Sequence, residues 1–376
     1  MKYCNLSDVA KIIMGQSPPS ITYNTICEGL PFFQGKADFG DLYPSVRYYC
    51  SKPIRIAEPG DILISVRAPV GPTNLNREYS CIGRGLSAIR VGDKVSRNYL
   101  FYFLRYYEPE LIKAGIGSTF EAISRDDIET VKIPFKALAE QKRIAELLEQ
   151  ADQLRLNKRF ARQFGETFLQ SVFMEMFGDL YRNPKGWKVE IVGEHITSIR
   201  YGTGSPPDYK KMGIPFIRAT NVKQGTIKKE GLVYISEEDA KKISKCRLNV
   251  GDLIVVRSGI NSGDCGLIPP EYNGAYAAYD LIVEVPYPTN YFINFIINSP
   301  YGKALIDTLS RRAGQPHVNA EQIEFMKFPF PPLQEQEFFA AVVRHYEHLH
   351  AIQYEAERQA EGLFQALLGR AFGKEL

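Results

Sequence analysis

The chain has 376 residues, of which 44% are apolar and 24% are charged, and its formal net charge is +3. These are ordinary values for a protein of two or three domains with sizeable cores, and no stretch of about 18 apolar residues that could span a membrane occurs. The N-terminal segment has no apolar signal-peptide core, so we expect a cytoplasmic protein.

The first 134 residues mix short apolar runs with turns. The sequence predicts a buried strand over 62–66 after the turn Gly60-Asp61, and an amphipathic helix over 98–107. A closing strand is predicted over 128–134, where a proline ends it. Residues 1–134 are therefore predicted to form a mixed α/β domain.

A helical segment of about 40 residues follows over 138–177. Its apolar residues recur at spacings of three and four, which is typical of a helix that packs against another helix. The stripe consists of Ile144, Leu147, Ala151, Leu154, Ala161, Phe164, Phe168 and Val172.

The second half of the chain repeats this plan. We predict a strand over 252–256, a helix over 291–298, a closing strand over 323–329 and a long helix over 333–372. Because a globular domain separates the two long helices, an antiparallel coiled-coil pair is the natural arrangement for burying their stripes.

The repeat is also visible residue by residue, since 123–178 align without a gap onto 318–373. Looser matches extend into the globular parts, where the Gly60-Asp61 strand corresponds to the Gly251-Asp252 strand. The predicted organisation is a duplicated half-protein, and a duplicated protein usually has a two-part target. Its segments are a first domain, a central helical region, a second domain and a C-terminal helical region, at 1–134, 135–180, 181–332 and 333–376.

The sequence offers no convincing catalytic, cofactor or metal site. It contains neither a G-x-G-x-x-G loop nor a G-x-x-x-x-G-K-[ST] loop, and no Asn/Asp-Pro-Pro-aromatic methyltransferase motif. The six cysteines include no Cys-x-x-Cys pair, and His345, His348 and His350 do not share one helix face. We therefore expect no enzyme activity, no cofactor and no metal.

Several repeated motifs resemble those of a known family. The strands that begin with Gly-Asp lead to Arg67 and Arg257, and two copies of Pro-Phe-x-x-Leu-x-Glu-Gln open the long helices at 134–141 and 329–336. The segments 117–124 and 315–319 also fit. In their order, duplication and spacing, these features resemble the specificity (S) subunit of a type I restriction-modification system over essentially the whole chain.

The resemblance implies a non-catalytic DNA-recognition subunit. Each globular domain would read one half of a bipartite, asymmetric target in double-stranded DNA, and the helices would set the spacer between the halves. The helices would also dock two methyltransferase (M) subunits and, through the complex, restriction (R) subunits. The complex would be an adenine-N6 DNA methyltransferase and an ATP-dependent endonuclease.

For DNA contact we expect polar and basic side chains on turns beside strand ends. Excess positive charge lies in the two globular domains, which supports this choice. The candidates are Gln16, Ser17, Gln34, Lys36, Arg67 and Arg84 in the first domain, and Thr203, Ser205, Arg218, Asn221, Lys223, Arg257 and Asn261 in the second. The strand-to-arginine spacing is one residue shorter in the second domain, so Arg67 and Arg257 need not play identical roles.

Two other functions remain as alternatives. The chain could be the recognition part of a single-chain restriction-methylation enzyme, although it lacks a methyltransferase motif. It could also be a stand-alone sequence-specific DNA-binding regulator, although the internal duplication makes a second copy unnecessary.

Overall fold

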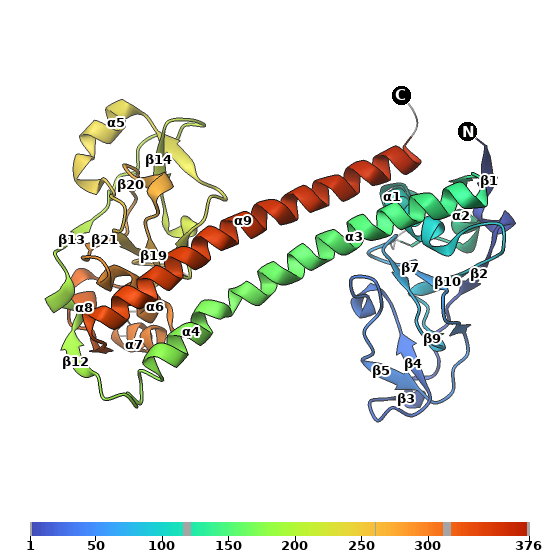
Figure 1. Ribbon diagram of the computed structural model, residues 1–376, viewed down its shortest axis with the longest axis horizontal. Coiled ribbons are helices and arrows are strands. Elements are labelled where there is room, and N and C mark those ends of the chain that lie inside the picture. The colour runs from blue at the N-terminus through green and yellow to red at the C-terminus, as the bar shows by residue number, and fades with distance from the viewer. Residues whose placement is uncertain (1, 116–121, 260, 311–316, 374–376) are drawn as a thin grey trace. The chain divides into compact units, whose positions relative to one another are not determined.

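The computed structural model describes residues 2–115, 122–259, 261–310 and 317–373, and Figure 1 shows its helices and strands. The chain divides into two compact units: Met1–Gln163 with Ile352–Leu376 form unit 1, and Phe164–Ala351 form unit 2. The parts of the repeated motifs at 117–121 and 315–316 lie outside the described residues. Within the described ranges, no helix is both long and apolar enough to cross a membrane.

Unit 1 contains short strands, a helix packed on them and most of the first long helix. Its strands are β1 (Tyr3–Asn5), β2 (Ala10–Met14), β3 (Tyr23–Asn24), β4 (Leu30–Phe33), β5 (Tyr48–Cys50), β6 (Ile56–Ala57), β7 (Ile62–Ser65), β8 (Thr73–Leu75), β9 (Ser80–Ile82), β10 (Leu86–Val91) and β11 (Lys132–Pro134). Its helices are α1 (Arg97–Gly115), α2 (Arg125–Glu129) and α3 (Leu138–Glu166), the last of which ends in unit 2.

Unit 2 repeats the arrangement with different loops. Its strands are β12 (Lys188–Ile191), β13 (Ser198–Tyr201), β14 (Ile214–Ile217), β15 (Val222–Lys223), β16 (Thr226–Ile227), β17 (Val233–Ile235), β18 (Leu253–Val255), β19 (Cys265–Leu267), β20 (Tyr276–Ala277), β21 (Leu281–Glu284) and β22 (Lys327–Phe330). Its helices are α4 (Phe168–Phe177), α5 (Glu237–Lys242), α6 (Thr289–Asn298), α7 (Pro300–Ser310), α8 (Ala320–Glu324) and the beginning of α9 (Leu333–Phe372).

The duplication seen in the sequence is present in the sheets. An antiparallel sheet of order β2-β10-β7-β8 in unit 1 matches one of order β13-β21-β18-β19 in unit 2. A smaller pair, β1-β11, matches β12-β22. The mixed α/β fold predicted from the sequence is therefore confirmed for both units.

The repeated Gly-Asp motif builds the turn before the central strand of each sheet. Gly60 and Gly251 have φ values of 91° and 89°, a region that glycine adopts without strain. Asp61 is buried and accepts hydrogen bonds from Arg90 on β10, at 3.0 and 3.1 Å. In unit 2 the equivalent Asp252 pairs with Arg200 at 3.0 Å. The motif thus has a structural role.

The two closing strands are shorter than predicted, because a short helix precedes each of them. Ser124 accepts a hydrogen bond from the backbone N–H of Asp127 and begins α2, and Asn319 begins α8 in the same way with Gln322. These capping boxes outweigh the strand-like pattern of the following residues. The strands therefore begin only at Lys132 and Lys327.

The repeated Glu-Gln of the helix-opening motif is also structural. The side-chain amide of the buried Gln141 donates to the carbonyl of Lys136 at 2.8 Å, and that of Gln336 donates to the carbonyl of Pro331 at 2.8 Å. Each glutamine therefore fastens the turn that leads into its long helix. The predicted helix over 333–372 is confirmed, whereas the one over 138–177 is interrupted at Thr167, between α3 and α4.

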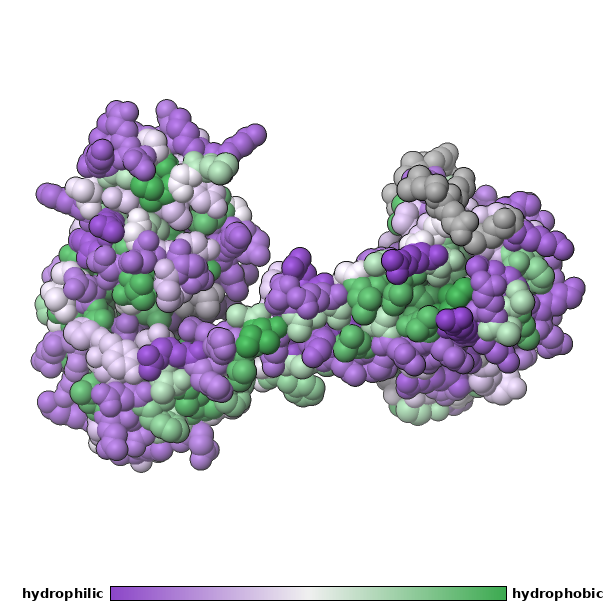
Figure 2. All heavy atoms as spheres, turned by 45° about the horizontal axis from the view of Figure 1, so that its top comes forward, coloured by the Kyte–Doolittle hydropathy of each residue, from purple (hydrophilic) through white to green (hydrophobic). Residues whose placement is uncertain are grey.

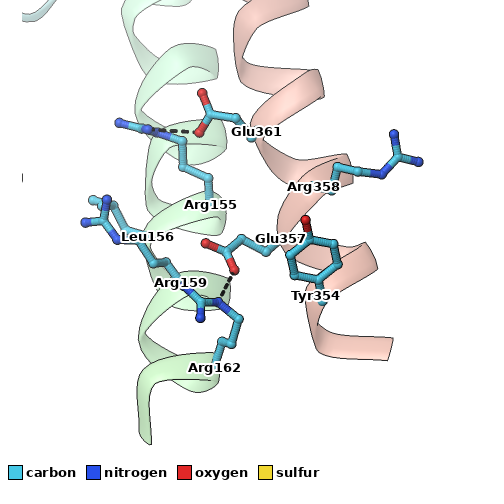
Figure 3. Close-up of a pocket in the computed structure, with 8 residues that line it drawn as sticks. All are labelled: Arg155, Leu156, Arg159, Arg162, Tyr354, Glu357, Arg358 and Glu361. Atoms are coloured by element: carbon cyan, nitrogen blue, oxygen red, sulfur yellow. Dashed lines mark hydrogen bonds and ion pairs between the residues drawn. The ribbon is translucent and has the colours of Figure 1, made fainter. Parts of the chain in front are cut away.

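Each unit contains its own contacts between the long helices. In unit 1, α3 and the end of α9 run antiparallel, and ion pairs join Arg155 to Glu361 at 3.0 Å and Arg162 to Glu357 at 2.6 Å (Figure 3). Near these pairs Phe364 and Leu368 belong to the unit 1 core. In unit 2, the rings of Phe173 on α4 and Phe339 on α9 lie 5.4 Å apart.

Candidate nucleic-acid interface

The structure gathers the predicted first-domain residues, except Gln16, around one hollow of about 250 Å³. Ser17 follows β2, Gln34 and Lys36 follow β4, Arg67 follows β7, and Arg84 lies between β9 and β10. The remaining lining residues are Gly35, Ser65, Ala68 and Gly85. Gln16 is exposed and directly precedes Ser17 in the sequence, but it does not line the hollow.

Close backbone packing builds this hollow. A Cβ added at Gly85 would lie 2.3 Å from the carbonyl oxygen of Gln34, so only glycine lets the two loops come this close. The buried carboxylate of Asp38 holds the same loop by accepting from the backbone N–H of Gln34 at 2.6 Å. Ser17 is fixed too, because its hydroxyl accepts from the backbone N–H of Arg84 at 3.2 Å.

Positive charge faces solvent at this hollow. Lys36, Arg67 and Arg84 are exposed, and none of them forms an ion pair with another described residue. The charge of Asp38 is offset by Arg47, with which it forms an ion pair. A concave surface with unpaired cations and glutamine and serine side chains suits a phosphate backbone with adjacent base edges.

Several predicted residues of the second domain serve its own loops. The Thr203 hydroxyl donates to the carbonyl of Ser205 at 3.0 Å and accepts from its N–H at 3.2 Å, which closes a local turn. Asn221 is fully buried and donates to the carbonyls of Lys228 and Glu230, both at 3.1 Å. The predicted contact of Asn221 with DNA is therefore wrong for this conformation, because its amide is buried and held by its own loop.

Arg218 also holds its own loop. One guanidinium nitrogen donates to the carbonyl of Gly231 at 2.6 Å, and the group lies over the ring of Tyr209 at 5.3 Å. Lys223 is exposed where β15 turns into β16, and Asn261 is partly exposed after β18.

Arg67 and Arg257 are not structural counterparts. The N–H of Ile123 donates to Val66, and the N–H of the matching Val318 donates to Arg257. Likewise Arg67 bridges Ala122, whereas Ser258 bridges His317. Arg257 therefore corresponds to the buried Val66, and Arg67 corresponds to Ser258. Because side chains alternate between the two faces of an extended segment, the one-residue difference turns Arg257 inward.

Because it points inward, the Arg257 side chain lies among two tyrosine rings and a histidine. Its guanidinium lies 4.5 Å from the ring centroid of Tyr201 and 4.3 Å from that of Tyr279, and it is 3.0 Å from Nε2 of His317. Its backbone N–H donates to the Asp280 carboxylate at 3.2 Å. Burial raises the pKa of Asp280 to about 6, and the hydrogen bond and charge of Arg257 oppose that rise.

The family model of the type I restriction modification DNA specificity domain matches residues 1–161 and 184–361. The chain belongs to this family. The match covers both units, and it accounts for the repeated motifs of this specificity protein. It favours neither the stand-alone regulator nor the single-chain enzyme.

Relatives of known sequence agree. A MjaX type I restriction enzyme specificity subunit from Methanocaldococcus jannaschii is 50% identical over 145 residues, which cover 38% of this chain and 34% of that protein. The chain thus matches about a third of the length of that relative. The StySPI specificity subunit of Salmonella potsdam is 27% identical over 377 residues, covering 91% of this chain and 80% of that protein.

A solved structure shares the fold. The type I restriction-modification S subunit from M. genitalium superposes with a TM-score of 0.70, and the superposition covers 100% of this chain and 96% of that chain. Sequence identity is 13%, so this likeness shows the fold alone.

Sequence reasoning missed Tyr201 and Tyr279, which cover the guanidinium of Arg257. Tyr201 is the last residue of β13, the counterpart of β2, and Tyr279 lies two residues before β21, the counterpart of β10, so the duplication offered a signal. Tyr279 stands where unit 1 has Gly85, because Leu281 and Ser87 occupy matching registers on β21 and β10. The two copies therefore differ at this position, where unit 2 has a tyrosine and unit 1 a glycine.

Proposed function

We propose that this chain is the DNA-reading subunit of a type I restriction-modification complex, with each globular domain reading one half of a two-part target in double-stranded DNA. The domains span 1–134 and 181–332. The observation that carries the proposal is the hollow of unit 1, where Gln34, Lys36, Arg67 and Arg84 converge. Glutamine and arginine can read base edges, and lysine can hold phosphates.

The long helices are proposed to form an antiparallel coiled coil that sets the spacer between the half-sites. Antiparallel contacts within each unit support this, including Arg155–Glu361 in unit 1 and the stacked rings of Phe168 and Tyr346 in unit 2, 5.9 Å apart. A helix of 40 residues rises about 60 Å, or about 1.5 Å for each residue. Matched deletions from both helices should therefore shorten the spacer.

The same helices are proposed to dock two methyltransferase subunits and, through the complex, restriction subunits. Large apolar side chains remain exposed on them, and Figure 2 shows hydrophobic patches among hydrophilic ones on one face. Examples are Leu147 on α3, 49% exposed, and Phe338 on α9, 62% exposed. Such side chains suit partner contact better than solvent.

Catalysis belongs to the partners in this proposal, which are expected to methylate adenine N6 and to cleave DNA with ATP. The chain itself would contribute DNA sequence recognition and geometry, and it would need no cofactor or metal. Among the described residues, no group of His, Cys, Asp and Glu side chains is arranged to hold a metal ion.

A domain exchange tests the proposal. Residues 1–134 are replaced with the corresponding domain of a relative that has a different target, and the methylated motif is read by sequencing the methylated genome of cells that carry the complex. One half of the motif should change and the other should stay. A motif altered in both halves, or in neither, would show that the domains are not independent readers.

A further inference from the structure

The two domains differ at equivalent ends of their sheets. In unit 1 this end carries the open hollow, with Gly85 and the outward Arg67 at its rim. In unit 2 the equivalent positions are Tyr279 and Ser258, and the equivalent of Val66 is Arg257. The second domain therefore presents an aromatic surface where the first presents a cationic one.

Tyr201 and Tyr279 form that surface. Each is 46% exposed, although both rings pack on the Arg257 guanidinium. Tyr201 ends β13 immediately before Gly202, the counterpart of Gly15, and Tyr279 precedes the residue that leads into β21. No hydrogen bond joins either phenol hydroxyl to another described residue, so both hydroxyls remain available to a ligand.

Arg257 itself is poorly placed to read DNA. Both rings stack on it, one of its terminal nitrogens faces His317, and its Nε is buried without a partner in the described part of the chain. Each cation–π contact stabilises the cation, so turning the guanidinium outward would give up two such contacts. The arginine orders the two rings and fixes their spacing.

We infer that Tyr201 and Tyr279 make the base contacts of the second domain and that Arg257 is a positioning residue that holds them. This inference rests on the proposed function, and it adds that the second half-site is read through neutral aromatic side chains. Rings held rigidly at a strand end can contact thymine methyl groups, and their hydroxyls can reach base edges in the major groove, at little entropic cost.

The salt dependence of DNA binding should therefore have different origins in the two domains. Neutral rings release no counterions, so their loss leaves the salt dependence of binding unchanged, whereas each lost phosphate contact lowers the slope of log K against log salt by about 0.9. A base contact through tyrosine is therefore visible as a change in sequence preference without a change in slope.

The test uses the full chain assembled with methyltransferase subunits. Binding is measured at several salt concentrations on the two-part target and on duplexes with the first or the second half-site scrambled. The variants are Tyr201→Ala, Tyr279→Ala, Arg257→Gln and Arg257→Lys. Tyr181→Ala is the matched control, because Tyr181 is a 78% exposed tyrosine of the same unit whose ring makes an edge-to-face contact with Tyr301.

Each tyrosine variant should lower affinity for the intact target by about tenfold and lose preference for the second half-site, with the salt slope and first-half preference intact. Arg257→Gln should do the same, and Arg257→Lys should restore part of the preference because an ammonium can also sit over the rings. Tyr181→Ala should match the wild type.

Three outcomes overturn the inference: tyrosine variants that bind like the wild type, a fall of about one in the slope for Arg257→Gln, or an equal loss at both half-sites. If an alanine variant fails to fold, judged by thermal unfolding, Tyr201→Leu and Tyr279→Leu replace it. A wild-type complex that ignores both scrambled half-sites would instead reject the proposed function itself.

Discussion

Replacing Arg67 with alanine separates base reading from phosphate holding in the first domain. Arg67 is exposed and its side chain has no ion pair with another described residue, whereas its carbonyl accepts from the Ser65 hydroxyl at 3.0 Å. The alanine variant keeps that backbone bond. Its free energy of unfolding should therefore stay within about 0.5 kcal/mol of the wild type.

The size of the binding loss depends on what Arg67 touches. Bidentate contact with a guanine is worth about 1–3 kcal/mol, so its loss should weaken binding roughly 5-fold to 150-fold, at one base pair of one half-site. Contact with a phosphate would instead weaken binding to every sequence and lower the salt slope by about 0.9. Lys36 and Arg84 share the hollow, so the three cations together account for a slope of about 2.7 if all of them hold phosphates.

The assay is fluorescence anisotropy with the full chain and its methyltransferase subunits on labelled target DNA over a salt series. Arg125→Ala serves as the control, because Arg125 is an exposed arginine of the same unit that pairs with Glu129 on α2. The reasoning is refuted if Arg67→Ala equals the control in affinity and slope, or if it changes preference at the second half-site.

Three further substitutions test the second unit, each by urea unfolding followed through Trp187, the single tryptophan of the chain, which packs against the unit 2 core. Asp280→Asn should remove a pH dependence. Burial raises the pKa of Asp280 to about 6 from 3.8, so the folded wild type keeps the proton to a higher pH than the unfolded chain does, and its stability falls by about 3 kcal/mol in total as pH rises from about 3 to about 7. An identical pH profile in the variant would contradict this. Asn221→Ala should destabilise the unit by about 1–3 kcal/mol, since the buried amide that ties the carbonyls of Lys228 and Glu230 together is lost, and a neutral effect would show that the loop does not need the amide. Phe173→Ala should cost about 3–5 kcal/mol, because this buried ring contacts several other phenylalanines, and a loss below 1 kcal/mol would argue against their packing.

The sequence alone determined the local and repeated features of this protein. The 3–4 spacing of apolar residues located the helix at 333–372, because helical periodicity is a local property of the chain. The Gly-Asp turns and the buried strands after them followed from local turn chemistry and apolar runs. The duplication and the family resemblance also needed no structure, and the family model confirmed the family.

Only the tertiary structure decided which of the candidate residues meet and which way they face. The hollow in unit 1 forms from loops that are distant in sequence, and no local pattern records that Gly85 brings Gln34 beside Arg67. From the sequence, Asn221 is expected to be a surface amide, whereas in the structure it is buried and donates to a backbone carbonyl. Arg257 lies one residue out of register with Arg67, and since side chains alternate along an extended backbone, that single step places its guanidinium under Tyr201 and Tyr279.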